Sequence, residues 1–169
     1  MNIVHEMLAR YEQNTAAERV NAMREVMQDI ALAGLQRGGF FDKAAFYGGT
    51  CLRIFHGLPR YSEDLDFSLL AADKGFELDH YFDSLRQEFE VLGFSVAIEP
   101  KRKANDSDIA SAFLKKTASQ CDVQVRGEKR LKLKLEVDID LPLGFETQGV
   151  LDFLCLRPSL DLSTAADVA

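Results

Sequence analysis

The sequence predicts a single α+β domain with a mixed β-sheet and helices packed on one face of that sheet. Two patterns support this prediction: helical and short extended segments alternate as far as Gly93, and strongly alternating segments follow it. The chain has 169 residues, which is the length of one ordinary domain, and it contains neither internal repeats nor a low-complexity linker. We therefore expect residues 1–169 to form one domain, with the polar face of its sheet left open.

Four segments show the spacing of helices. They span residues 2–11, 15–36, 50–56 and 76–92. In the second segment, Thr15 and Glu18 fit a capping box, apolar residues recur at helical spacing, and Gly38 follows the end. The last segment ends at Gly93, because glycine readily adopts the backbone conformation that closes a helix.

Six segments show the shorter period of strands. They span residues 44–47, 65–70, 94–98, 109–117, 121–125 and 131–141. The last one alternates most regularly, with leucine, valine and isoleucine on one face and lysine, glutamate and aspartate on the other. Helical segments precede the first strand, separate the first two strands and follow the second, and the remaining strands come after them. This order indicates a mixed sheet.

The composition excludes several classes of protein. The apolar fraction is 47% and the charged fraction 28%, values typical of soluble globular domains. No apolar run reaches the length of a membrane span and the N-terminus has no signal-peptide pattern, so we expect no membrane contact and a cytoplasmic location. The three cysteines are widely spaced without a Cys-x-x-Cys motif, which favours reduced thiols over disulfides or a zinc site.

The distribution of charge is uneven. The net charge of −7 argues against attraction to nucleic acid over the whole surface. Basic residues nevertheless outnumber acidic ones between Lys101 and Lys134. This segment is either a set of solvated strands and loops or a local basic strip that binds triphosphate or RNA.

A glycine-rich turn shortly before two aspartates indicates phosphate and metal binding. Gly48 and Gly49 allow backbone N–H groups to approach phosphate oxygens, and a following helix adds a favourable dipole. Asp64 and Asp66 lie at positions i and i+2 of a strand, so their side chains share a face. Such carboxylates repel each other unless a cation lies between them, and Mg²⁺ is the usual ion. An isolated Asp-x-Asp pair is more often structural, so the assignment depends on its surroundings.

Those surroundings favour a metal-bound nucleotide. Thr50 and the two glycines lie one short helix before the aspartates, while Arg60 and Ser62 directly precede them and could bind phosphate oxygens. The later strand carries Glu136 and Lys134 on its polar face. A third carboxylate could complete two Mg²⁺ sites and orient an attacking hydroxyl, while a lysine neutralises triphosphate charge. The alternative is that this lysine only protects an exposed strand.

These motifs resemble a known family. Gly49-Thr50, a spacer of thirteen residues, Asp64-Leu65-Asp66-Phe67 and a later Leu135-Glu136-Val137 resemble the nucleotidyltransferase signature of the DNA polymerase β superfamily. The fuller string G-G-T-x-L-R-x-x-x-G-x-x-R-x-S-x-D-L-D-F is similar to the AbiEii/AbiGii toxin nucleotidyltransferases of abortive-infection and toxin–antitoxin systems. The resemblance covers roughly residues 46–153.

The resemblance implies a nucleotidyltransferase fold and Mg²⁺-dependent transfer of a nucleoside monophosphate from an NTP to an acceptor hydroxyl. It suggests RNA, such as the end of a tRNA, as acceptor and an antitoxin protein as partner. For the third catalytic carboxylate, beside Asp64 and Asp66, Glu136 is favoured over Asp138. The implied metal ligands are Asp64, Asp66, Glu136 and Asp138. The implied nucleotide ligands are Gly48, Gly49, Thr50, Arg60, Ser62 and Lys134.

Relatives in this family usually continue into a helical C-terminal half, and this sequence ends where such a half would begin. We therefore expect only the N-terminal nucleotidyltransferase module. Two other functions remain open: a non-catalytic remnant that binds nucleotide or a partner, and a metal-dependent nuclease, since carboxylate clusters also cleave phosphodiesters.

Overall fold

The computed structural model describes residues 2–101, 118–128, 131–140 and 146–147. Within these residues the sheet has five strands in the order β1-β2-β5-β4-β3. The strands are β1 (Ala44–Tyr47), β2 (Asp64–Leu69), β3 (Val96–Pro100), β4 (Ala118–Val125) and β5 (Lys132–Asp138). The β2–β5 pair is parallel and all other neighbouring pairs are antiparallel. The predicted α+β class with a mixed sheet is confirmed.

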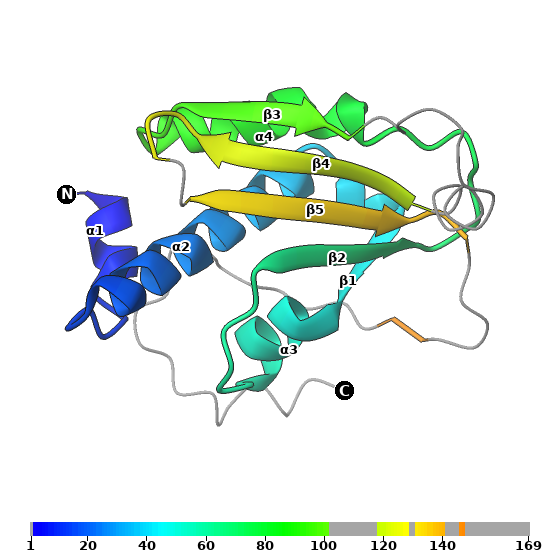
Figure 1. Ribbon diagram of the computed structural model, residues 1–169. Helices are drawn as coiled ribbons and strands as arrows, with labels where there is room; N and C mark the ends of the chain where they lie inside the picture. The colour runs from blue at the N-terminus through cyan, green and yellow to red at the C-terminus, as the bar shows by residue number, and fades with distance from the viewer. Residues whose placement is uncertain (1, 102–117, 129–130, 141–145, 148–169) are drawn as a thin grey trace, which may run out of the picture.

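The longer helices pack on one face of the sheet, as expected (Figure 1). The helices are α1 (Ile3–Leu8), α2 (Ala16–Arg37), α3 (Gly48–His56) and α4 (Phe82–Val91), with 3₁₀ turns η1 (Phe40–Asp42) and η2 (Leu78–Tyr81). Helices α2 and α4 contact each other behind the sheet, α2 against β5 and α4 against β3. Helix α3 contacts β1 and β2, where it lies beside the edge of the sheet.

The core forms between these helices and the apolar face of the central strands. Leu65 and Phe67 of β2 and Leu135 of β5 are fully buried, because alternate residues of a strand point to one face. Phe40 packs edge-on against Phe67 with 4.9 Å between ring centroids. The other face of these strands is therefore the only one on which their polar side chains can lie.

The predicted start of α2 is confirmed in detail. The Thr15 hydroxyl accepts a hydrogen bond from the Glu18 backbone N–H, and the Glu18 carboxylate accepts one from the Thr15 N–H. This reciprocal capping box satisfies two N–H groups that a helix start otherwise leaves unpaired. Gly38 caps the other end.

Two predicted boundaries were wrong at helix ends. Residues 76–92 do not form one helix, because Leu78–Tyr81 is a 3₁₀ turn and α4 begins at Phe82. The tighter turn places Leu78 and Tyr81, three positions apart, on the same buried side. Strand β3 starts at Val96 instead of Phe94, because the Phe94 N–H still bonds to the Phe89 carbonyl and closes α4.

The helix after the glycine turn also starts earlier than predicted. It begins at Gly48 and not at Thr50, so both glycines belong to its first turn. The predicted strand at residues 109–117 lies outside the described residues. None of the helices in the described part of the chain is both long and apolar enough to cross a membrane. Neither Cys51 nor Cys121 forms a disulfide.

Candidate active site

The parallel pairing of β2 with β5 gathers the predicted carboxylates on one face. Asp66 lies directly opposite Glu136, and Asp64 lies opposite Lys134. The intervening residues of both strands, including Leu65 and Leu135, point into the core. We call the side that carries Asp64, Asp66, Lys134, Glu136 and Asp138 the polar face.

The register separates the two candidates for the third carboxylate. Glu136 pairs with Asp66, whereas Asp138 lies one step further along β5 and pairs with Ser68. The carboxylates that raise the pKa of Asp66, after its own burial, are Asp64 and Glu136, so these three acidic groups form one cluster. Asp138 shares their face at greater separation along the strand.

Burial and like charges act together on the Asp66 carboxyl. The pKa of Asp66 lies above its ordinary value, mainly because the carboxyl is partly buried and also because Asp64 and Glu136 repel its charge. Lys134 acts in the opposite direction on the same group. The cluster therefore favours an additional cation.

Lys134 lies among these carboxylates. Its ammonium is 2.8 Å from Glu136 Oε2 and 3.9 Å from Asp64 Oδ2. The hydrogen bond to Glu136 is the main reason that the pKa of Lys134 is raised. The Gln120 side-chain amide of β4 also donates to Glu136 Oε2, at 2.7 Å. Two side chains, Lys134 and Gln120, thus hold the same oxygen of Glu136.

The first turn of α3 packs against the aspartates without room for larger residues. Gly48 has φ +81°, and a Cβ there would lie 2.6 Å from Asp66 Oδ2. A Cβ on Gly49 would lie 2.9 Å from the Ser62 hydroxyl and 3.4 Å from a guanidinium nitrogen of Arg60. The two glycines therefore let Asp66, Ser62 and Arg60 converge on the start of the helix.

Thr50 connects this helix to β2. Its side chain is only 1% exposed, and its hydroxyl donates to the Asp64 backbone carbonyl at 2.5 Å. The side chain therefore fixes the strand that carries the aspartates, and the backbone N–H in the first turn of α3 is the group that Thr50 can offer to a ligand.

Sequence reasoning missed two residues of the site. Tyr47 lies opposite Asp66 on β1, is 49% exposed, and has a pKa raised by burial and by Asp66, Asp138 and Glu136. Gln120 reaches the site only through the pairing of β4 with β5. The position of Tyr47 immediately before the glycines was a usable signal, whereas Gln120 had none because its register depends on the fold.

The oxygen donors of the polar face suit a hard divalent cation. Among the described residues, no group of three or more histidine, cysteine, aspartate or glutamate side chains is arranged as a ready metal site. Three carboxylates nevertheless share the face, and the pKa of Asp66 is raised by its burial and, to a smaller extent, by repulsion from Asp64 and Glu136. Carboxylate oxygens are the ligands that Mg²⁺ prefers, so the chemistry of the donor set fits this ion.

The sequence of the chain is similar to that of a known protein family. A family model described as the nucleotidyl transferase AbiEii toxin of a type IV toxin–antitoxin system matches residues 30–150. No curated protein sequence matches the chain.

Several solved structures are similar to the chain, including the following two. One is MenT4, a nucleotidyltransferase toxin from Mycobacterium tuberculosis, with a TM-score of 0.45 and 20% identity over 80% of this chain and 43% of that one. The other is JHP933 from Helicobacter pylori, with a TM-score of 0.45 and 19% identity over 73% of this chain and 45% of that one. The chain thus spans less than half the length of either.

Proposed function

Because the chain belongs to the AbiEii family of nucleotidyltransferase toxins, we propose that it transfers a nucleoside monophosphate from an NTP to a hydroxyl of an RNA acceptor, with Mg²⁺ as cofactor. The observation that carries this proposal is the parallel register of β2 and β5. It sets Asp64, Asp66 and Glu136 on one face, and Asp66 directly adjoins the first turn of α3.

The proposed site binds the triphosphate through groups of two adjoining elements. Backbone N–H groups in the first turn of α3, from Gly48 to Thr50, would donate to phosphate oxygens, because a helix start leaves such groups without intrahelical acceptors and carries the positive end of the helix dipole. The Arg60 guanidinium and the Ser62 hydroxyl lie beside this turn and would bind phosphate oxygens. Lys134 would neutralise further phosphate charge.

In the transfer step, the acceptor oxygen bonds to the α-phosphorus while the bond from that phosphorus to the α–β bridging oxygen breaks. Pyrophosphate leaves, and the hydroxyl proton passes to a base. We assign the proton to Glu136, which Lys134 and Gln120 hold in place through Oε2. Mg²⁺ held by Asp64 and Asp66 would neutralise charge on the phosphates and lower the pKa of the attacking hydroxyl. Asp138, one step further along β5, would serve as an outer ligand.

The proposed acceptor rests on the resemblance of the sequence to nucleotidyltransferase toxins. We propose RNA, with tRNA as the first candidate, and the cytoplasm, where RNA and NTPs are abundant, as the place of action. An antitoxin protein is the corresponding partner, since the family belongs to type IV toxin–antitoxin systems.

The test is transfer of label from [α-³²P]NTP to total RNA in the presence of Mg²⁺. We expect labelled RNA with the wild type and none with the Asp64→Ala/Asp66→Ala variant. The matched control is Asp42→Ala/Asp83→Ala, which removes two exposed carboxylates outside the site and should label RNA as the wild type does.

Three outcomes would separate the possible functions. Stabilisation by Mg²⁺ and NTP in a thermal-shift assay without labelled RNA would indicate a nucleotide-binding module. Loss of prelabelled RNA would indicate a nuclease. Absence of any effect of NTP at millimolar concentration would overturn the proposed nucleotide site.

A further inference from the structure

The segment from residue 57 to 63, which we call the α3–β2 loop, delivers two of the proposed phosphate ligands. Arg60 and Ser62 lie in this loop and adjoin Gly49 at the start of α3. A loop of this length has many conformations in isolation, and fixing each residue has a cost in backbone entropy. Specific contacts must therefore hold it.

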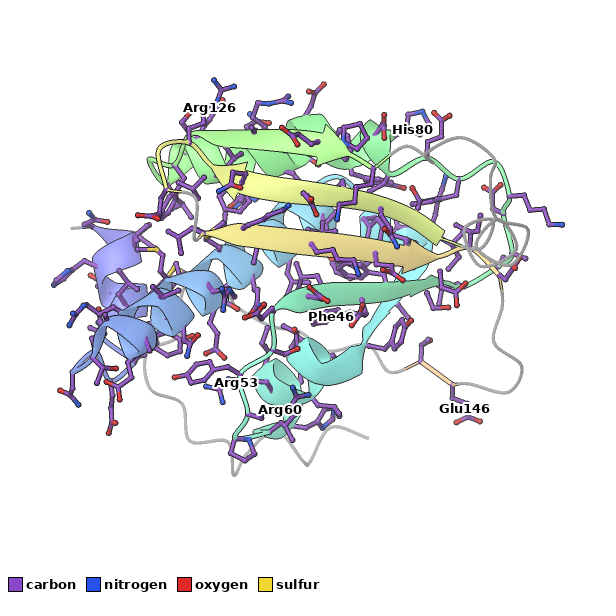
Figure 2. All side chains as sticks on the ribbon, in the orientation of Figure 1. Phe46, Arg53, Arg60, His80, Arg126 and Glu146 are labelled. Atoms are coloured by element: carbon purple, nitrogen blue, oxygen red, sulfur yellow. The ribbon has the colours of Figure 1, made fainter. Side chains whose placement is uncertain are left out.

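Arg53 of α3 provides the largest set of those contacts. One terminal nitrogen of its guanidinium donates to the carbonyls of Leu58 and Pro59, at 3.0 and 2.9 Å. The guanidinium also lies 4.0 Å from the centroid of the Tyr61 ring, within cation–π distance. A single side chain thus contacts three of the seven residues of the loop. Figure 2 shows Arg53 and Arg60 together beside α3.

The other side of the same guanidinium is anchored to α2. Its Nε and second terminal nitrogen pair with the carboxylate of Glu25. The side chains of Arg53 and Glu25 are only 19% and 8% exposed. A buried ion pair of this kind contributes little net stability, because desolvation offsets the attraction, so fixing a conformation accounts for it better than stability does.

Helix α2 contacts the end of the loop at two further points. The Gln28 amide donates to the Ser62 carbonyl at 2.8 Å, and Arg24 pairs with Glu63 at 2.9 Å. Glu25 and these two residues lie within one helical turn or so, which makes this stretch of α2 a rigid support. Arg53 completes the support where α2 does not reach the loop directly.

We propose that Arg53 is a positioning residue for the nucleotide site: by joining Glu25 to the α3–β2 loop, it makes Arg60 and Ser62 face the first turn of α3. The inference rests on the proposed function, because the phosphate-binding roles of Arg60 and Ser62 belong to it. Only arginine can fill this role, since its planar fork serves a carboxylate, two carbonyls and an aromatic ring at once.

The first measurement is amide hydrogen exchange of the protein without nucleotide. In Arg53→Met we expect exchange of the α3–β2 loop to accelerate by about tenfold or more, while amides of β4 and β5 keep their wild-type rates. The control is Arg37→Met, which also removes an arginine from a buried glutamate, Glu88, but at the far end of α2. It should leave exchange of the loop unchanged. Equal protection of the loop in Arg53→Met and the wild type would overturn the proposal.

The second measurement is the Kd of Mg²⁺-ATP by calorimetry. We expect Arg53→Met to weaken binding by about 10- to 100-fold and Arg37→Met by less than about twofold. Adding Arg53→Met to the Arg60→Met/Ser62→Ala variant separates positioning from general destabilisation. If Arg53 acts through Arg60 and Ser62, this addition changes the Kd by less than about twofold. A further loss as large as the one that Arg53→Met causes in the wild type would overturn the proposal.

The two proposals fail in different ways. A wild-type chain that binds none of the four Mg²⁺-NTPs overturns the proposed function, and hydrogen exchange alone then decides whether Arg53 holds the loop. Wild-type binding that survives unchanged in Arg53→Met overturns the positioning role and leaves the proposed function intact.

Discussion

The two faces of the β2–β5 pair differ in what holds their side chains in place. On the apolar face, Leu65, Phe67 and Leu135 are fully buried, and shape and the exclusion of water fix them. On the polar face, Lys134 pairs with Glu136 and lies near Asp64, while Asp64 and Glu136 repel the charge of Asp66. Under the proposed function, adjacent residues of one strand serve stability and chemistry separately, and substitutions on the two faces should have separate effects.

The largest effect is expected on the apolar face. Phe67→Ala should lower the free energy of unfolding by about 3–5 kcal/mol, because it removes a buried ring and leaves a cavity beside Phe40. Urea denaturation measures this loss. A loss below about 1 kcal/mol would mean that the core does not depend on this face of β2.

The polar face should show the complementary result. Glu136→Gln should reduce transfer of label by about 100-fold or more while the midpoint of urea unfolding changes little, because a neutral amide is a poor base and metal ligand. The matched variant is Asp138→Asn, one step along the same strand. Asp138→Asn should reduce transfer of label by less than about fivefold. A larger loss in Asp138→Asn than in Glu136→Gln would assign the third carboxylate to Asp138.

Gly48→Ala should affect both stability and nucleotide binding. A side chain at φ +81° costs about 1–2 kcal/mol, and its Cβ would also displace the Asp66 carboxylate. Both stability and Mg²⁺-NTP binding should therefore fall together. Gly93→Ala is the control, since Gly93 has φ +87° but its Cβ would meet nothing within 4 Å. It should lose stability alone.

The smallest effect concerns pH. The pKa of Asp66 is raised above its unfolded value, so its ionised form opposes folding at pH values above the folded pKa. In metal-free protein Asp66→Asn should therefore raise Tm slightly at pH 7. The gain should shrink as the pH falls through the raised pKa towards 3.8, because wild-type Asp66 then takes up its proton. Scanning calorimetry at pH 4 and pH 7 tests this, and a lower Tm for the variant at pH 7 would contradict it.

Local sequence patterns predicted most helices and strands, whereas they could not predict contacts between elements that are distant in the sequence. The capping box at Thr15 and the alternation around Leu135 are local, so both could be read directly. The register that pairs Asp66 with Glu136 depends on how the whole sheet assembles. Arg53 has no local signal, because Glu25 lies 28 positions away in the sequence. Its role appears only when α2 packs beside the α3–β2 loop.

The ammonium of Lys134 allows the polar face to form before a metal ion binds. Because it lies against Glu136 and near Asp64, the acidic cluster has a cation of its own when the sheet forms. A divalent ion that binds here would displace this ammonium. The cluster would gain the two positive charges of the ion and lose the single charge of the lysine, so the net gain would be smaller than two. The displaced lysine would remain tethered to β5, free to meet the phosphates that arrive with the ion. Folding and loading of the site can therefore be separate events.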